Sequence, residues 1–126
     1  MNYSRQRQAI IDYLASTKEH PTAETIYAAV KKDNPKISLG TVYRNLTLLV
    51  ETGEIQKIST GDSFEHYDAD TSAHGHYYCR VCHRVMDLDI YPSADQVLSA
   101  SGAGIGSVER ASLLFTGICN DCSSLQ

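Results

Sequence analysis

The sequence of 126 residues contains no long apolar run and no hydrophobic segment near its N-terminus. A membrane-spanning helix needs about 20 consecutive apolar residues, so the absence of such a run predicts that the protein has no membrane partner. Residues 1–7 lead into no apolar stretch, and we therefore expect no secretory signal and a cytoplasmic protein. Because thiols stay reduced in that compartment, the four cysteines indicate metal binding more than disulfides.

The sequence also lacks the motifs of several common classes of protein. The glycine-rich segment 101–106 follows a predicted helix and lacks the Gly-Lys-Ser/Thr ending of a P-loop, so we expect no phosphate site there. Neither of the two Cys-x-x-Cys pairs lies in a βαβ pattern, which argues against a thioredoxin-like redox protein. The sequence also shows no internal repeat.

The composition is that of a globular protein whose charges are unevenly divided. Hydrophobic residues make up 42% and charged residues 21% of the chain, and its length allows one or two small domains. Residues 1–58 carry eight Lys/Arg and six Asp/Glu (+2), whereas residues 59–126 carry three and nine (−6), which together give the net charge of −4. A basic first half can bind phosphates while an acidic second half binds cations and dimerises.

The first half has the apolar periodicity of three helices, which we predict at residues 4–15, 21–32 and 38–53. Ser4 and Ser38 are the expected N-caps of the first and third helices. The third helix has apolar residues at the spacing of a buried face, namely Leu39, Val42, Leu46 and Leu49. The second and third helices, joined by a short turn, suit a helix-turn-helix motif.

Residues 54–67 are expected to form a hairpin around a turn at residues 60–62, which completes a winged helix-turn-helix domain at residues 1–68. The third helix presents polar residues that suit a DNA major groove, namely Thr41, Tyr43 and Arg44. Arg5, Arg7 and Lys57 are expected to contact phosphates or the minor groove. The pattern alone also allows a small helical domain whose polar face is merely solvated.

The second half, residues 69–126, is predicted to be a small α/β domain, so the whole chain has the fold class α+β. Strands are expected at residues 76–79, 85–90 and 112–118. Pro92 is expected near the first turn of a helix that continues to about residue 100.

The four cysteines form two Cys-x-x-Cys pairs, and their members are Cys79, Cys82, Cys119 and Cys122. Each pair can place two thiolates on one tight turn, and two such pairs make a tetrahedral all-sulfur site that favours structural Zn²⁺. A redox dithiol and four incidental cysteines are the alternatives. His83 follows the second cysteine where a glycine is common, and histidine tolerates a left-handed backbone better than most residues.

Histidine and aspartate residues offer a second, harder donor set near the first cysteine pair. His74 and His76 are two residues apart, so their imidazoles would share one face of a strand. Asp68 and Asp87 add carboxylates, and mixed nitrogen and oxygen donors suit Fe²⁺, Mn²⁺ or Zn²⁺. Two surface histidines are the alternative reading, and His20 alone is more often a loop residue than a ligand.

Three motifs together make the chain similar to a known family. They are His20-Pro-Thr-Ala-Glu-Thr-Ile-Tyr, Ser38-Leu-Gly-Thr-Val-Tyr-Arg-Asn-Leu, and His74-Gly-His76 with the two Cys-x-x-Cys pairs. Over about residues 4–122 the sequence closely resembles the ferric uptake regulator (Fur) superfamily. The resemblance implies a homodimeric, metal-dependent repressor with an N-terminal winged helix and a C-terminal dimerisation domain. Its implied partner is double-stranded DNA with a palindromic, A/T-rich operator.

Within this superfamily the chain most resembles the peroxide-sensing repressors. That resemblance implies a regulatory Fe²⁺ or Mn²⁺ ion held by His20, Asp68, His74, His76 and Asp87. It further implies that peroxide reacts with the Fe²⁺ form and oxidises His20 or His74, so that DNA is released, whereas Mn²⁺ would not support this reaction. Iron-sensing members usually have glutamate where this chain has the two aspartates.

Several alternatives stay open at the level of sequence. In sequence, an iron-availability repressor is distinguished from a peroxide sensor by little more than glutamate in place of the two aspartates. We expect no enzyme, although histidines with a carboxylate could also serve a non-haem metalloenzyme. His66 lies two residues before Asp68 and could compete as a ligand, and Gly40 lies in the third helix, where it costs about 1 kcal/mol relative to alanine.

Overall fold

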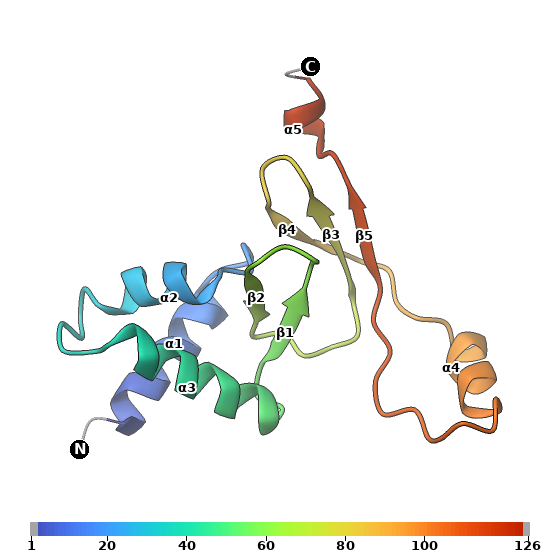
Figure 1. The fold of residues 1–126 in the computed structure, drawn as a ribbon, viewed down its shortest axis with the longest axis horizontal. Coiled ribbons are helices and arrows are strands. Elements are labelled where there is room, and N and C mark those ends of the chain that lie inside the picture. Colours follow the sequence, from blue (N-terminus) through green and yellow to red (C-terminus); the bar gives the residue numbers. More distant parts are fainter. Residues whose placement is uncertain (1–2, 125–126) are drawn as a thin grey trace. The chain divides into compact units, whose positions relative to one another are not determined.

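The computed structural model describes residues 3–124 and divides into two compact units, Met1–Thr71 and Ser72–Gln126 (Figure 1). Sequence analysis placed the division after residue 68. The structure keeps the next residues with the first unit because Ala69 packs against its core and the Gln56 side chain donates a hydrogen bond to the Asp70 carbonyl. Within residues 3–124, no helix is long and apolar enough to cross a membrane.

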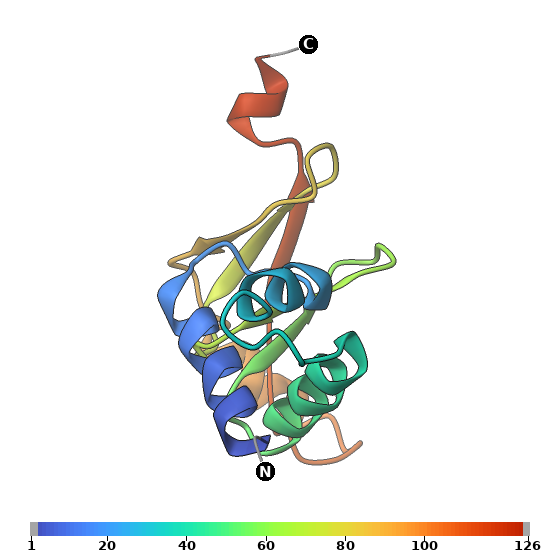
Figure 2. The same cartoon turned by 90° about the vertical axis from the view of Figure 1, so that its left-hand side faces the viewer.

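The first unit begins with three helices, α1 (Tyr3–Ser16), α2 (Ala23–Val30) and α3 (Leu39–Glu51) (Figure 2). The predicted cap of α3 is confirmed, because Ser38 Oγ accepts a hydrogen bond from the Thr41 amide at 3.1 Å. Thr22 caps α2 in the same way. Helix α1 already includes Tyr3, so Ser4 lies in the first turn and not at the cap position, and its side chain lies outside the described part of the chain.

A hairpin follows the helices and completes the winged helix-turn-helix that the sequence predicted. Strands β1 (Gln56–Ser59) and β2 (Glu65–Asp68) pair antiparallel, with Gln56 opposite Asp68. Gly61 lies in the connecting turn with φ of 90°, a left-handed value that glycine adopts without strain. Side chains from α1, α2, α3 and β2 share one buried core, which includes Ile10, Leu14, Ile26, Val42, Leu46, Leu49 and Tyr67.

The second unit is built on a three-stranded sheet with the order β4-β3-β5. Its strands are β3 (Gly75–Cys79), β4 (Val85–Leu88) and β5 (Leu114–Gly117), and the last two are shorter than predicted. Strand β3 pairs antiparallel with β4 and parallel with β5. A short helix that the sequence analysis missed, α5 (Asn120–Ser123), follows β5 and carries Cys122.

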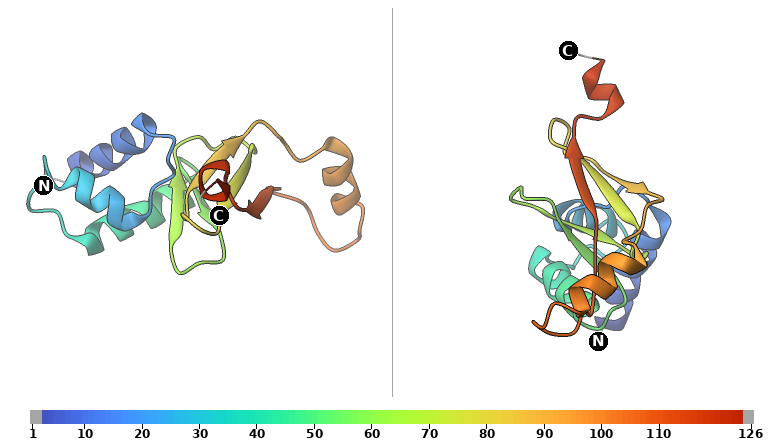
Figure 3. Two further views of the ribbon diagram at one scale, coloured as in Figure 1. Left: turned by 90° about the horizontal axis from the view of Figure 1, so that it is seen from above. Right: turned by 90° about the vertical axis from the view of Figure 1, so that its right-hand side faces the viewer.

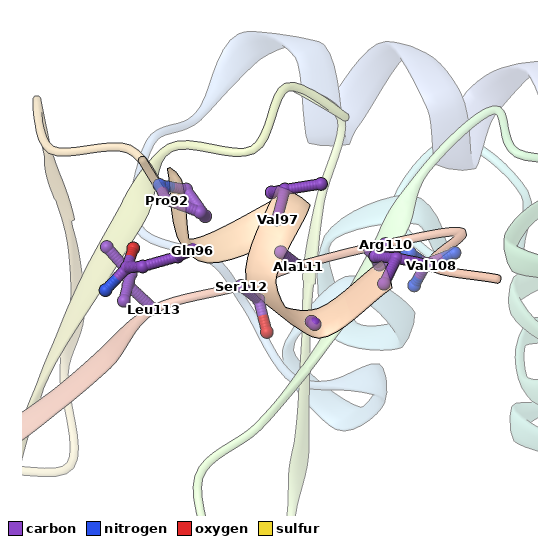
Figure 4. Close-up of a pocket in the computed structure, with 9 residues that line it drawn as sticks. Pro92, Gln96, Val97, Val108, Arg110, Ala111, Ser112 and Leu113 are labelled. Carbon is purple, nitrogen blue, oxygen red and sulfur yellow. The ribbon is translucent and has the colours of Figure 1, made fainter. Parts of the chain in front are cut away.

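Helix α4 (Ala94–Ser101) stands apart from the sheet of the second unit, and extended segments join it on both sides (Figure 3). Ser93 and Gln96 form a capping box at its start, one residue after the predicted Pro92. The helix buries none of its side chains within the described chain. A pocket of about 360 Å³ lies between α4 and residues 108–113 (Figure 4), so the helix is left with an incompletely covered face.

Candidate metal sites and recognition helix

Four cysteine side chains of the second unit converge on one point. The residues are Cys79 at the end of β3, Cys82 in the turn toward β4, Cys119 just before α5, and Cys122 within it. Their sulfur atoms all lie within 4.8 Å of one another, and Sγ of Cys82 is 3.9 Å from Sγ of Cys119. Four sulfurs at about 2.3 Å from a tetrahedral Zn²⁺ are about 3.8 Å apart, so this arrangement fits the ion.

Backbone amides favour the ionised form of the first cysteine. The amides of Cys119 and Cys82 donate to Cys79 Sγ at 3.4 Å and 3.5 Å and lower the pKa of Cys79 to about 5. The pKa of Cys119 is also lowered, mainly by the backbone amide of Cys122. Because the thiolate is the form that binds metal, both shifts suit a cation site. The contact with Cys119 raises the pKa of Cys122 to about 12, because without a cation the crowded sulfurs disfavour a further negative charge.

The turn after the first cysteine pair requires a left-handed residue, and His83 supplies it. Its φ is 65°, and its amide donates to the Cys79 carbonyl at 2.8 Å. The His83 Nδ1 atom lies 2.6 Å from the Tyr78 hydroxyl, which holds the imidazole against the sheet. The expectation that histidine can replace the usual glycine here is confirmed.

Two histidines and one aspartate of the second unit form a polar cluster at the start of the sheet. His76 on β3 pairs with Asp87 on β4, and their Nε2 and Oδ1 atoms are 3.6 Å apart. His74 precedes β3, and its Nε2 atom lies 2.7 Å from Asp87 Oδ1. Both histidines are buried, and their ring centroids are 4.4 Å apart. Sequence reasoning placed these three residues near one ion, and the structure brings them together.

The first unit contains a second buried pair, His20 and Asp68. The Nδ1 atom of His20 lies 3.4 Å from Asp68 Oδ2, and the exposed fractions of the two residues are 2% and 6%. The Asp70 amide donates to the other Asp68 oxygen at 2.9 Å. A buried imidazole and a buried carboxylate are costly to desolvate unless they are paired or bind a cation, so the pair is a candidate for metal binding.

His66, which the sequence suggested as a competing ligand, contacts the backbone of the His20 loop in the first unit. Its Nδ1 atom lies 2.9 Å from the His20 carbonyl oxygen, and the Tyr67 amide donates to the Pro21 carbonyl at 3.0 Å. These bonds attach the loop of His20, whose φ is 51°, to the strand that ends at Asp68. His66 therefore positions the His20 backbone.

Helix α3, the predicted recognition helix, presents the three predicted residues on its polar side. Tyr43 and Arg44 are exposed and Thr41 is partly exposed. Arg44 donates to the Thr41 hydroxyl at 3.0 Å. The Tyr43 hydroxyl donates to Glu24 of α2 at 2.5 Å, which lowers the pKa of Glu24 and raises the pKa of Tyr43 to about 12. Tyr43 is therefore neutral at physiological pH, with its ring accessible.

Basic residues surround this helix in the first unit. Arg5 and Lys36 line one pocket of about 280 Å³, and Lys57 is exposed on β1. Sequence reasoning missed Lys36, although its position just before the Ser38 cap was a usable signal. Arg7 instead donates to Asn45 of α3 at 3.3 Å, and so it connects two helices.

Comparison with known proteins agrees with this architecture. The model of the family described as "Ferric uptake regulator family" matches residues 1–103. The peroxide operon regulator of Bacillus subtilis (strain 168) is 38% identical over 120 residues, which cover 94% of this chain and 81% of the relative. The peroxide-responsive repressor PerR of Staphylococcus saprophyticus is 36% identical and is covered to 79%, with 93% of this chain aligned. The chain belongs to the ferric uptake regulator family.

Solved structures show the same fold. The Campylobacter jejuni peroxide stress regulator superposes with a TM-score of 0.77 at 27% identity, over 96% of this chain and 91% of its own. The Helicobacter pylori ferric uptake regulator superposes with a TM-score of 0.78 over 94% of this chain and 80% of its own. At 19% identity, the second comparison bears on the fold alone.

Proposed function

We propose that this chain is a metal-dependent, dimeric repressor that senses peroxide through iron-catalysed oxidation of a ligand histidine. The observation that carries the proposal is the contact of buried histidines with aspartates in a chain 38% identical to a peroxide operon regulator. The donors are imidazoles and carboxylates, which suit Fe²⁺ and Mn²⁺. The chain acts as a regulator and not as an enzyme.

The proposed regulatory ligands are three histidines and two aspartates, namely His20, Asp68, His74, His76 and Asp87. Within the first unit His20 lies beside Asp68, and within the second unit Asp87 lies beside both other histidines. When bound there, Fe²⁺ would supply redox chemistry with peroxide, which Mn²⁺ would not. His20 and His74 are the imidazoles proposed to gain oxygen, and an oxidised imidazole is a poorer ligand.

The second proposed ion is a structural Zn²⁺ on Cys79, Cys82, Cys119 and Cys122, supported by the sulfur geometry. Cysteines supply most of the small buried cluster there, which Met86 and Ile118 complete. A unit as small as this one gains much of its folding free energy from such a metal.

DNA recognition is proposed to use α3 in the major groove, with Tyr43, Arg44 and Thr41 facing base edges and Arg5, Lys36 and Lys57 contacting phosphates. Two copies would place two such helices on a palindromic, A/T-rich operator. The unburied helix α4, with Leu98 68% exposed, supports association through the second unit. Regulation would follow if one ion held ligands from both units, because its loss would free the unit that carries α3.

The function is tested by operator binding before and after peroxide. Zinc-containing protein is loaded anaerobically with Fe²⁺ or Mn²⁺ and mixed with labelled operator, and binding is followed by fluorescence anisotropy. We expect stoichiometric peroxide to abolish binding in the iron form only, with one oxygen atom added to the peptide containing His20 or His74. Equal persistence of both complexes would instead indicate an iron-availability repressor. Turnover of a small substrate without specific DNA binding would indicate a metalloenzyme.

Base and phosphate contacts are separable by substitution. Arg44→Ala is expected to weaken operator binding by about 1–3 kcal/mol and to leave binding to random DNA nearly unchanged. Lys36→Ala should weaken binding to operator DNA and to random DNA alike. It should also reduce the slope of the logarithm of the binding constant against the logarithm of the salt concentration by about one unit. The matched control is Lys31→Ala, because that ammonium already contacts the Tyr27 hydroxyl at 2.6 Å. Equal losses on both DNAs for Arg44→Ala would contradict a base contact.

A further inference from the structure

A cationic side chain contacts the cysteine cluster of the second unit. Arg84 immediately precedes β4, and its Nη2 atom lies 3.6 Å from Cys119 Sγ and 3.3 Å from Asp121 Oδ2. Asp121 lies in α5, two residues after Cys119, so one guanidinium contacts both a sulfur and the helix that follows it. Arg84 also comes two residues after Cys82, and it therefore connects the two Cys-x-x-Cys segments.

The electrostatics of this contact are favourable. An arginine guanidinium is a permanent cation at physiological pH, so the Arg84 contact places a positive charge beside the Cys119 sulfur. Four thiolates around one Zn²⁺ carry excess negative charge, which makes their sulfurs nucleophilic. A charge-assisted hydrogen bond withdraws electron density from the acceptor and stabilises it in the ionised state.

We propose that Arg84 protects the zinc site from the peroxide that the regulatory site senses, by donating a hydrogen bond to Cys119. The inference rests on the proposed function, since it assumes zinc on the four cysteines and exposure to peroxide. The zinc site would then stay intact at peroxide concentrations that oxidise the regulatory site. Cys82 and Cys119 are the pair at risk, because their sulfurs are 3.9 Å apart and Cys82 is exposed.

The reaction that Arg84 would suppress is ordinary thiolate oxidation. The Cys119 sulfur donates an electron pair to one peroxide oxygen, the O–O bond breaks, and hydroxide leaves, which gives a sulfenic acid. The Cys82 thiolate then attacks that sulfur and expels a second hydroxide, which gives a disulfide. The two sulfurs lose two electrons in total, and the peroxide is reduced to two hydroxide ions. Zinc loses two ligands and is released.

Zinc release under peroxide tests the proposal. Protein with zinc but without iron is treated with excess peroxide, and released Zn²⁺ is followed with a coloured chelator. We expect Arg84→Ala to release zinc about tenfold faster than the unsubstituted chain, with a Cys82–Cys119 disulfide as the first product by peptide mass spectrometry. Arg84→Gln keeps a neutral donor and should give an intermediate rate.

Arg80→Ala is the matched control. Arg80 lies between Cys79 and Cys82 and carries the same charge, but among the described residues its side chain donates no hydrogen bond to a sulfur. Its rate should equal that of the unsubstituted chain. Equal rates for Arg84→Ala and the unsubstituted chain, or equal acceleration by Arg80→Ala, would overturn the proposal. Absence of zinc from the untreated protein would instead contradict the proposed structural site, and the zinc content measured at the start separates the two failures.

Discussion

Cys119→Ser is expected to abolish zinc binding and to unfold residues 72–124, while helices α1 to α3 stay folded. Serine cannot supply a thiolate, and the three remaining sulfurs leave the ion without a tetrahedral set. Zinc sites of this kind contribute apparent binding free energies of about 10–16 kcal/mol, which is more than a small unit can lose. The first unit has its own core of packed helices and does not depend on these sulfurs.

The measurement is zinc content by mass spectrometry together with hydrogen exchange on each unit. Protection should disappear from β3, β4 and β5 and persist in α1, α2 and α3. Asn120→Ala is the matched control, because Asn120 is exposed in the same segment and offers no sulfur. A Cys119→Ser protein that kept one zinc per chain and normal protection in β3 would show that the cluster is not a structural metal site.

His20→Ala is expected to abolish metal-dependent operator binding while zinc content and dimerisation stay normal. The imidazole is buried beside Asp68, in a loop whose backbone contacts His66 of β2. If the regulatory ion couples to DNA binding, its loss should weaken operator affinity by about 5- to 150-fold. By the same linkage, operator DNA should tighten Mn²⁺ binding by an equal factor.

Backbone strain has to be separated from ligand loss in this experiment. The φ of His20 is 51°, which alanine adopts at a cost of about 1–2 kcal/mol and glycine adopts without strain. His20→Gly should therefore fail in metal-dependent binding as His20→Ala does, but with less loss of thermal stability. Glu19→Ala, at an exposed neighbouring position, is the control. Normal Mn²⁺-dependent operator binding by either His20 variant would refute its role as a ligand.

Local patterns in the sequence predicted most of the first unit. The Ser38 cap and the apolar residues of α3 are within one helix, and the hairpin turn is set by neighbouring residues, so short-range rules were sufficient. The same rules were weaker in the second unit. Strands β4 and β5 are shorter than predicted, and α5 is a single turn that carries no periodic apolar signal.

Contacts between distant residues were beyond those rules. The sequence could not show that the Tyr43 hydroxyl donates to Glu24, that Arg7 bonds Asn45, or that His66 holds the backbone of His20. Each contact joins residues from different segments of the chain, and its distance depends on how those segments pack. For the same reason, nothing in the sequence indicated that His66 contacts the His20 carbonyl oxygen.

The sequence by itself determined the donor chemistry, because cysteine and histidine spacing limits which ions a chain can hold and where a tight turn must form. The tertiary structure alone decided which atoms meet. Strand β3 lies in the middle of the sheet and pairs with β5, which places Cys79 opposite Gly117 and brings the second cysteine pair beside the first. Arg84 and Cys119 are 35 residues apart in the sequence. They meet because the sheet places β4 and β5 on either side of β3.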